Sequence, residues 1–437
     1  MTGGQREPNR LRKWRASHVR RRIALSFMKE FRLNWTVVLA TFIGIATGNA
    51  LSHYTMSLFA PELIKEFGWS KAQFALVSAL PLITAVITPL AGRFTDKFGA
   101  RVAASIGLAA MSLGFFALST LNGNIYEFFA IWLLQHIFGV MSTSLVFARI
   151  IVDRFDRARG TALSLLMMGP PLSGAVVAPI LGWIIAADGW RAGFVSLAAA
   201  SAVGGTICIF FLGRIAKRQA DTGEVRNPRL SLAELGAIAR QPAFLLIVGG
   251  MFMINIAQPF AASQLKLVVL SKGISDSAGT WMVSLYATGV IIGRAIFGIA
   301  LDRISANKVA LFGLSLPAVG FAILGMPGMT VSLCAAGIML IGIAQGAEGD
   351  IGGYLVSRHF NLRNFSLVFA FVKSGLDAGG AIGALILSFT LAMSGGSYDA
   401  FIWICAGTTL VGAFLFFLTG ADRTTRDPGT VLETEAN

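Results

Sequence analysis

Apolar runs alternate with short polar connections along most of the chain. Each run has about 20 residues, the length that an α-helix needs to cross the hydrocarbon core of a bilayer. The pattern predicts twelve membrane-spanning helices, at about 35–59, 73–92, 102–121, 127–151, 161–186, 192–213, 243–268, 279–300, 308–326, 329–356, 365–393 and 399–420. The sequence therefore predicts an all-α membrane protein.

One longer polar stretch, at 214–241, divides the predicted helices into two sets of six. We expect a first six-helix bundle at 34–213 and a second at 242–420, with 214–241 as the inter-bundle loop. A basic tail at 1–33 and a polar tail at 421–437 flank the bundles. Lys and Arg gather in the tails, the central loop and alternate connections, so the positive-inside rule predicts that both termini and the loop are cytoplasmic.

The two sets of helices carry related sequences. GRFTDKFGAR at 92–101 returns as GIALDRISANK at 298–308, and VDRFDRARGTALSL at 152–165 returns as VSRHFNLRNFSLVF at 356–369. Such internal duplication is typical of transporters, whose substrate sites lie near the membrane midplane between the repeats. We therefore expect two homologous six-helix bundles with a site between them.

Composition agrees with this class and excludes others. The chain is 55% apolar and 13% charged and contains 49 glycines, which suits a polytopic membrane protein. Its net charge of +14 would also suit a nucleic-acid-binding protein, but the basic residues follow the connections, so we expect no nucleic acid partner. The cysteines lack metal-ligand spacing, and no nucleotide loop or nucleophile–base pair is recognisable. We expect no cofactor, no metal and no enzymatic activity.

The connection after the second predicted helix carries the pattern G-x-x-x-D-x-x-G-x-R. Asp96 can cap a neighbouring helix N-terminus, where negative charge is favoured, and Arg101 can pair with Asp153 at the end of the fourth predicted helix. We expect these residues to hold the inner face together in one conformational state and to release it in another; a plain structural turn is the alternative. The second half carries an altered copy of this motif. The residues assigned to gating in the two copies are Gly92, Asp96, Gly99, Arg101, Asp153, Asp302 and Arg303.

Twelve helices in two related halves, with this motif between the second and the third, resemble the major facilitator superfamily. The resemblance covers about residues 34–420. It implies transport of a small molecule by alternating access between the two bundles, usually by a monomer.

Two cations lie deep inside predicted helices: Arg294 in GVIIGRAIFGIALDR and Lys373 in FAFVKSGLDAGG. A charge at that depth costs several kcal/mol unless it faces a cavity or a partner, so by default it marks a functional site. At a rise of about 1.5 Å per residue both positions reach the midplane, where one small anion could contact both. The planar guanidinium of arginine suits a carboxylate.

A narrower resemblance starts from these two cations. Arg294, which precedes Phe297-Gly298, looks like the arginine of the monocarboxylate transporter and oxalate:formate antiporter group, and Lys373 looks like the lysine that the antiporters place opposite it. The resemblance implies that both residues hold substrate carboxylates. Animal monocarboxylate transporters carry an acidic residue one turn before the arginine, where this chain has Val290, so a coupled proton would need another group.

Three acidic residues inside predicted helices are candidates for that group: Asp377, Glu348 and Asp350. Desolvation and like-charge proximity can favour protonation of such carboxylates, which would suit a proton relay. The alternatives are structural. Asp377 can pair with Lys373 four residues before it, and the other two can balance nearby arginines.

Other polar residues fall on helices that line the cavity in the superfamily. Each is either a substrate contact or an interhelical hydrogen bond. With Arg294 and Lys373, the residues assigned to substrate binding are His53, Tyr54, Gln135, His136, Asn255, Gln258 and Gln345.

Together these features predict a monomeric secondary transporter in the inner (plasma) membrane of the cell. We expect it to carry a small, monocarboxylate-like organic anion across the lipid bilayer by alternating access, with proton symport. One alternative is an efflux antiporter for amphipathic compounds, whose apolar pocket would tolerate the loss of Arg294. Another is a transporter-like receptor that binds without transport, although the tails offer no large soluble domain.

Overall fold

The computed structural model describes residues 30–80, 82–156, 158–216, 238–301, 303–360 and 362–420, and the regular elements in these ranges are all helical. The first half contains the span Glu30–Phe67 with α2 (Asn49–Phe67), then α3 (Lys71–Ala75), η1 (Leu76–Ser78), α4 (Leu82–Phe98), α5 (Ala100–Ser119), α6 (Ile125–Gly139), η2 (Val140–Ser142), α7 (Ser144–Val152) and α8 (Arg159–Ala216). The second half contains α10 (Pro242–Asn255), the π-helix η3 (Phe260–Gln264), α11 (Leu265–Ser271), α12 (Asp276–Leu301), α13 (Ala306–Gly325), α14 (Val331–His359), α15 (Leu362–Met393) and α16 (Asp399–Leu418).

The described residues form the predicted number of membrane spans. Ten helices are long and apolar enough to cross a membrane, and the bent pair Lys71–Thr84 with Val86–Phe98 makes an eleventh span. The 58-residue α8 is two helices joined at Gly189, whose backbone (φ 84°, ψ 170°) is non-helical and lies in a region that glycine adopts without strain. The predicted fold of twelve helices in two six-helix bundles is confirmed.

The first helix is longer than predicted. The prediction ended it near residue 59, because polar residues such as Glu62 and Glu66 follow, but the helix continues to Phe67 and ends where Gly68 adopts a left-handed conformation (φ 68°). Glu66 accepts hydrogen bonds from Trp190 Nε1 at 2.5 Å and from an Arg191 guanidinium nitrogen at 2.7 Å. The two predicted tails and the inter-bundle loop lie mostly outside the described residues, so their bounds stay predictions.

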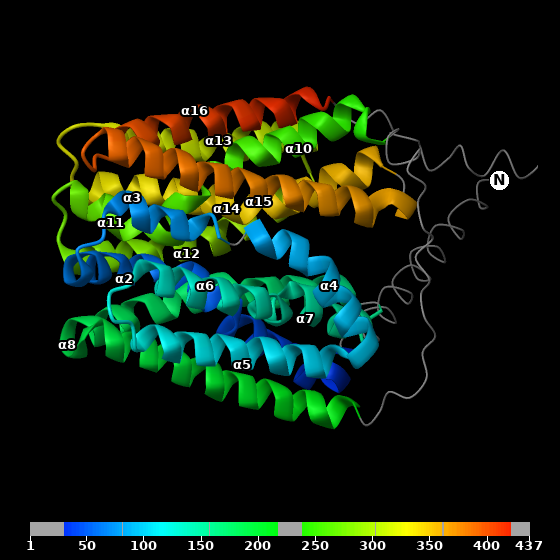
Figure 1. Cartoon of the computed structure of the whole chain (residues 1–437). Helices are drawn as coiled ribbons and strands as arrows, with labels where there is room; N and C mark the ends of the chain where they lie inside the picture. The colour runs from blue at the N-terminus through cyan, green and yellow to red at the C-terminus, as the bar shows by residue number, and fades with distance from the viewer. Residues whose placement is uncertain are drawn as a thin grey trace, which may run out of the picture.

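The two bundles lie side by side and share one hydrophobic core at one end (Figure 1). We call this end, which holds the connections after Phe67, Ser271 and Met393, the predicted outer end. Its cluster of buried apolar side chains includes Phe59 of the first bundle and Phe260 of the second. Toward the opposite, predicted inner end, each bundle has a cluster of its own. The bundles are therefore joined most extensively at the predicted outer end.

Small residues let α12 and α14 cross with their backbones in contact. A Cβ atom added at Gly293 would overlap the carbonyl oxygen of Ile343, and one added at Gly346 would overlap that of Val290. Close approach of this kind replaces the hydrophobic effect as the source of helix association inside a membrane. The crossing fixes the position of Arg294, which follows Gly293 directly.

We predict that Gly293→Ala destabilises the second bundle, because overpacking a close helix contact costs about 1–3 kcal/mol. The expected result is a drop of several degrees in the thermal unfolding temperature of the detergent-solubilised protein. Gly298→Ala is the matched control on the same helix, since nothing lies within 4 Å of a Cβ added there. Equal unfolding temperatures for the two variants would contradict the crossing.

Candidate functional site

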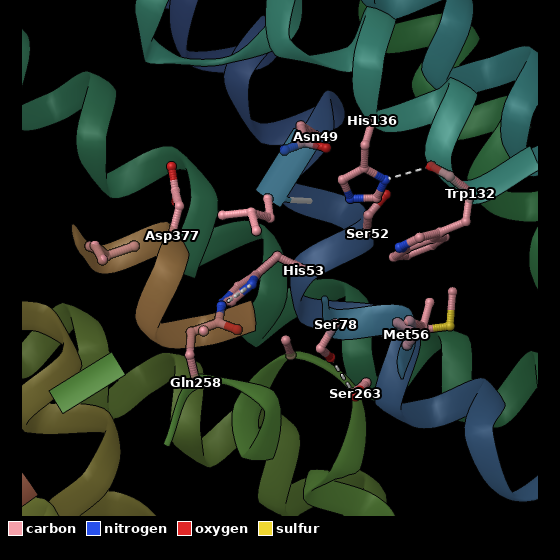
Figure 2. Close-up of a pocket in the computed structure, with 15 residues that line it drawn as sticks. Asn49, Ser52, His53, Met56, Ser78, Trp132, His136, Gln258, Ser263 and Asp377 are labelled. Carbon is pink, nitrogen blue, oxygen red and sulfur yellow. Dashed lines mark hydrogen bonds between the residues drawn. The ribbon is translucent and has the colours of Figure 1, made fainter. Parts of the chain in front are cut away.

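A cavity of about 130 Å³ lies between the two bundles (Figure 2); we call it the main cavity. Its lining is rich in side chains that donate or accept hydrogen bonds. The first bundle contributes Asn49, Ser52, His53, Ser78 and His136, and the second contributes Gln258, Ser263 and Asp377. Of the predicted binding residues, the structure therefore brings His53, His136 and Gln258 together here, with the predicted proton-coupling residue Asp377.

Breaks in the helices supply much of this lining. α2 begins at Asn49 after Gly48, and the backbone N–H of Asn49 donates to Ser142 Oγ at 3.0 Å, where η2 interrupts the fourth span. In the seventh span α10 ends at Asn255, and Gln258 lies in the break before η3. Non-helical backbone inside a membrane is tolerated where it is buried in protein or lines a cavity. These breaks therefore direct polar groups at the main cavity.

The two histidines that line the main cavity carry their ring protons on different nitrogens. His136 Nδ1 is 2.9 Å from the carbonyl oxygen of Trp132. A carbonyl can only accept, so Nδ1 carries the proton, and in the neutral ring Nε2 is an acceptor. His53 Nδ1 is 3.5 Å from Gln258 Nε2, an amide nitrogen that can only donate, so the neutral His53 ring keeps its proton on Nε2. The pair offers one donor and one acceptor to a ligand.

A second cavity, of about 20 Å³, lies inside the second bundle. It is large enough for one water molecule, and its polar lining is Asn255, Gln258, Gln345, Glu348 and Thr409. Glu348 is 2% exposed. It accepts hydrogen bonds from Asn255 Nδ2 and, at 2.8 Å, from Gln345 Nε2. Gln258 lines both cavities, so its side chain lies between them.

The two deep cations are each held by an aspartate. Arg294 Nε is 3.4 Å from Asp350 Oδ2, and an Arg294 guanidinium nitrogen donates at 2.7 Å to the carbonyl oxygen of Met167 on α8, in the other bundle. Lys373 Nζ is 2.5 Å from Asp377 Oδ1, the i,i+4 pair that the sequence allowed. Neither cation lines either cavity, so the predicted site at which one anion contacts both is not formed in this structure.

Two predicted binding residues point away from both cavities. Tyr54 is buried, and its ring lies edge-on to His53 and near Tyr286. Gln135 is also buried and donates through Nε2 to the carbonyl oxygen of Met111 at 3.0 Å. Both residues pack the helices on which the cavity residues stand.

The gating motif makes a different ion pair from the predicted one. Asp96 pairs with Arg149 on α7, and the ion pairs among the described residues do not include Arg101 with Asp153. The guanidinium of Arg101 lies instead against Gly213 of α8, because α5 packs along α8. The pairing predicted for Arg101 is therefore absent from this structure.

The glycines of the motif have distinct surroundings. Gly99 has a positive φ of 87° and forms the turn before α5, a position that favours glycine. A Cβ added at Gly92 meets nothing within 4 Å. In the second copy Arg303 is exposed and Asp302 lies outside the described residues.

Several contacts between the bundles were not predicted. Ser78 Oγ of η1 and Ser263 Oγ of η3 are 2.7 Å apart, on the wall of the main cavity toward the predicted outer end. Nearby, Lys71 Nζ donates at 3.3 Å to the carbonyl oxygen of Gly396 and lies over the ring of Tyr398. Single serines within apolar runs give little signal in a sequence, since most bond to their own helix.

Comparison with known proteins places the chain in a family. A model of the Major Facilitator Superfamily matches residues 37–268 and 250–435, so the chain belongs to this superfamily. Monocarboxylate transporter 11 of Mus musculus is 24% identical over 412 residues, which cover 87% of this chain and 86% of the mouse protein. The agnestins efflux protein of Paecilomyces divaricatus is 24% identical over 317 residues, 68% of this chain and 67% of the fungal protein. The crystal structure of a variant of the nucleoside transporter NupG aligns with a TM-score of 0.69 at 14% identity, covering 89% of this chain and 99% of that chain, and shows the fold.

The chain is thus a multi-pass membrane transporter of this superfamily and resembles the monocarboxylate transporters. This class confirms the predicted family and makes a small-molecule substrate the expected ligand of the main cavity.

We predict that the double variant Ser78→Cys with Ser263→Cys forms a disulfide under mild oxidation. The two oxygens are 2.7 Å apart, so sulfur atoms in their places would lie close enough to bond. Mass spectrometry of the digested double variant should find the linked peptides. Digests of either single variant should not contain them. The native cysteines are buried and should not compete. Failure to link under any oxidising condition would contradict the closed contact.

Proposed function

We propose that this transporter carries a small organic carboxylate together with a proton, by alternating access, across the inner membrane of the cell. The observation that carries the proposal is the pair of Lys373 with Asp377, in which the aspartate lines the main cavity. A carboxylate that enters the cavity has the same charge and chelating oxygens as Asp377, and it can replace Asp377 as the partner of Lys373. The Arg294–Asp350 pair offers the same exchange on α12 and α14.

The charge balance favours entry of a proton with the anion. Each deep cation already has its own aspartate, so an added carboxylate leaves one negative charge without a counter-charge. An uncompensated charge inside a membrane is strongly unfavourable. A proton bound at Asp377, Glu348 or Asp350 restores neutrality, and symport follows from the same electrostatics that hold the pairs together.

The dimensions and lining of the main cavity support a small polar substrate. Pockets for drug-sized ligands usually measure about 300–1,000 Å³, and this cavity measures about 130 Å³. The N–H donor on His53 can bind an oxygen of a carboxylate. A large amphipathic compound does not fit this volume.

The distribution of cores supports alternating access. The shared core closes the predicted outer end, and the separate cores leave the inner halves of the bundles able to move independently. We infer an inward-facing conformation, with both termini cytoplasmic. The Asp96–Arg149 pair, at the predicted inner end of the first bundle, belongs to the region that rearranges.

A second candidate is export of amphipathic compounds. The likeness to the agnestins efflux protein favours it. Efflux of that kind needs an apolar pocket and no intramembrane cation, so loss of Arg294 distinguishes the two candidates.

We predict that purified protein in liposomes accumulates a radiolabelled monocarboxylate when the outside is more acidic than the inside. Arg294→Ala and Lys373→Ala should each lower uptake about 10-fold or more, because a charge-assisted hydrogen bond contributes about 1.5–3 kcal/mol and 1.4 kcal/mol is tenfold. Lys272→Ala is the control: it removes a cation from the Lys272–Asp399 pair at the predicted outer end, away from the cavity.

Uptake that is indifferent to Arg294 and Lys373, or absent for every acid of a broad panel, would overturn the carboxylate proposal. Uptake that depends on both cations but not on the pH gradient would remove proton symport alone.

A further inference from the structure

Glu348 is the buried acid with the most unusual surroundings. It is 2% exposed, its two oxygens accept from the neutral amides of Asn255 and Gln345, and the ion pairs of the described residues do not include it. Burial of a charged carboxylate is costly without a cation beside it. A proton is the simplest counter-charge for such a site.

The other two acidic candidates are held differently. Asp350 pairs with Arg294, and Asp377 pairs with Lys373. While no carboxylate is bound, a proton on either aspartate would leave its cation unpaired inside the membrane, which is strongly unfavourable. Glu348 can gain and lose a proton without breaking an ion pair.

The groups that face Glu348 from neighbouring helices connect it to the anion site. From α15, the positive charge of Lys373 acts on Glu348. From α12 comes Tyr286, whose hydroxyl is buried without a hydrogen-bond partner among the described residues. The residues that α13 and α16 contribute to the second cavity do not titrate: Leu314, Pro317, Phe321 and Thr409. Lys373 is therefore the charge that both Glu348 and Asp377 share.

Gln258 separates Glu348 from the main cavity. Its side chain lines both cavities, and Figure 2 shows it directed at His53. The 3.5 Å contact between Gln258 Nε2 and His53 Nδ1 crosses from the second bundle to the first. Relative motion of the bundles changes this distance, so the position of Gln258 depends on the conformational state.

We propose that Glu348 binds the proton that moves with the carboxylate, and that Gln258 is the wall between Glu348 and the main cavity. This inference rests on the proposed function and names its proton site. When the bundles move and His53 releases Gln258, the side chain rotates and the two cavities join, which opens Glu348 to the water of the main cavity.

Proton and carboxylate then strengthen each other's binding. A proton on Glu348 removes one negative charge near Lys373, so Lys373 attracts an anion more strongly. Linkage requires the reverse effect to be equal: a carboxylate bound at Lys373 tightens the binding of the proton. Neither the proton nor the carboxylate alone favours the state with both bound. Symport requires this dependence of each ligand on the other.

The first test measures the proton itself and needs no substrate. Infrared difference spectra between acidic and alkaline pH on the purified protein should show the carbonyl band of a protonated carboxylic acid. One component of this band should be lost in Glu348→Gln and kept in Glu127→Gln, the same chemical change in the first turn of α6, outside both cavities. A Glu348→Gln spectrum that keeps every component of the wild-type band would overturn the proposal, whatever the substrate is.

The second test measures coupling in liposomes. Glu348→Gln should lose accumulation driven by the proton gradient, at least about 10-fold, and keep exchange of labelled for unlabelled carboxylate. Gln258→Ala, which removes the wall, should conduct protons without carboxylate. Gradient-driven accumulation that survives in Glu348→Gln would overturn the proton assignment and leave the proposed function intact.

If the Glu348→Gln protein neither accumulates nor exchanges carboxylate, the Glu348→Asp variant decides the outcome, because it keeps a carboxyl group. The shorter side chain should retain coupling with a shifted pH profile of exchange. A profile identical to that of the wild type would overturn the proposal.

Discussion

Charge pairing shapes the interior of this protein more than any other interaction. The two deep cations, Arg294 and Lys373, are held by Asp350 and Asp377, and Arg149 at the predicted inner end is held by Asp96. The Asp96–Arg149 pair links the second and fourth helices of the first bundle, and its aspartate is on the second helix. The Arg294–Asp350 pair links the second and fourth helices of the second bundle, and its aspartate is on the fourth helix. Each of these pairs is neutral before substrate arrives, so an anion that binds one of the cations must displace its partner and bring a counter-charge.

A related constraint governs the backbone. Every backbone N–H and C=O group needs a partner in a membrane, so a helix is interrupted only where the freed groups meet protein or a cavity. The breaks at Gly48, at η2 and between Asn255 and η3 all lie beside the main cavity. These interruptions turn polar side chains of otherwise apolar helices toward one place. The position of the site in the fold follows from them.

The contacts between the bundles are of two kinds. The shared apolar core at the predicted outer end is extensive and includes side chains such as Phe59 and Phe260. The polar contacts, such as Ser78 with Ser263 and His53 with Gln258, are single hydrogen bonds. Each is worth about 1 kcal/mol, which suits bonds that must break and reform during a transport cycle. The polar contacts connect residues of the binding site in one bundle to those in the other. The shared core determines which end of the protein is closed.

The twelve spans, the two related halves and the charged residues could be predicted from the sequence, because run length, repetition and composition are properties of the chain alone. The sequence also identified His53, His136 and Gln258 as binding candidates and Asp377 as a proton-coupling candidate, and all four line the main cavity. Which residues meet depends on the tertiary structure: Arg149 lies beside Asp96, Arg101 does not pair with Asp153, Tyr54 and Gln135 line neither cavity, and Glu348 lies between two amides. The physical reason is that a regular helical period gives the direction of a side chain only along an unbroken helix. At a break, neighbouring helices set that direction, and a partner is chosen by distance across the bundle.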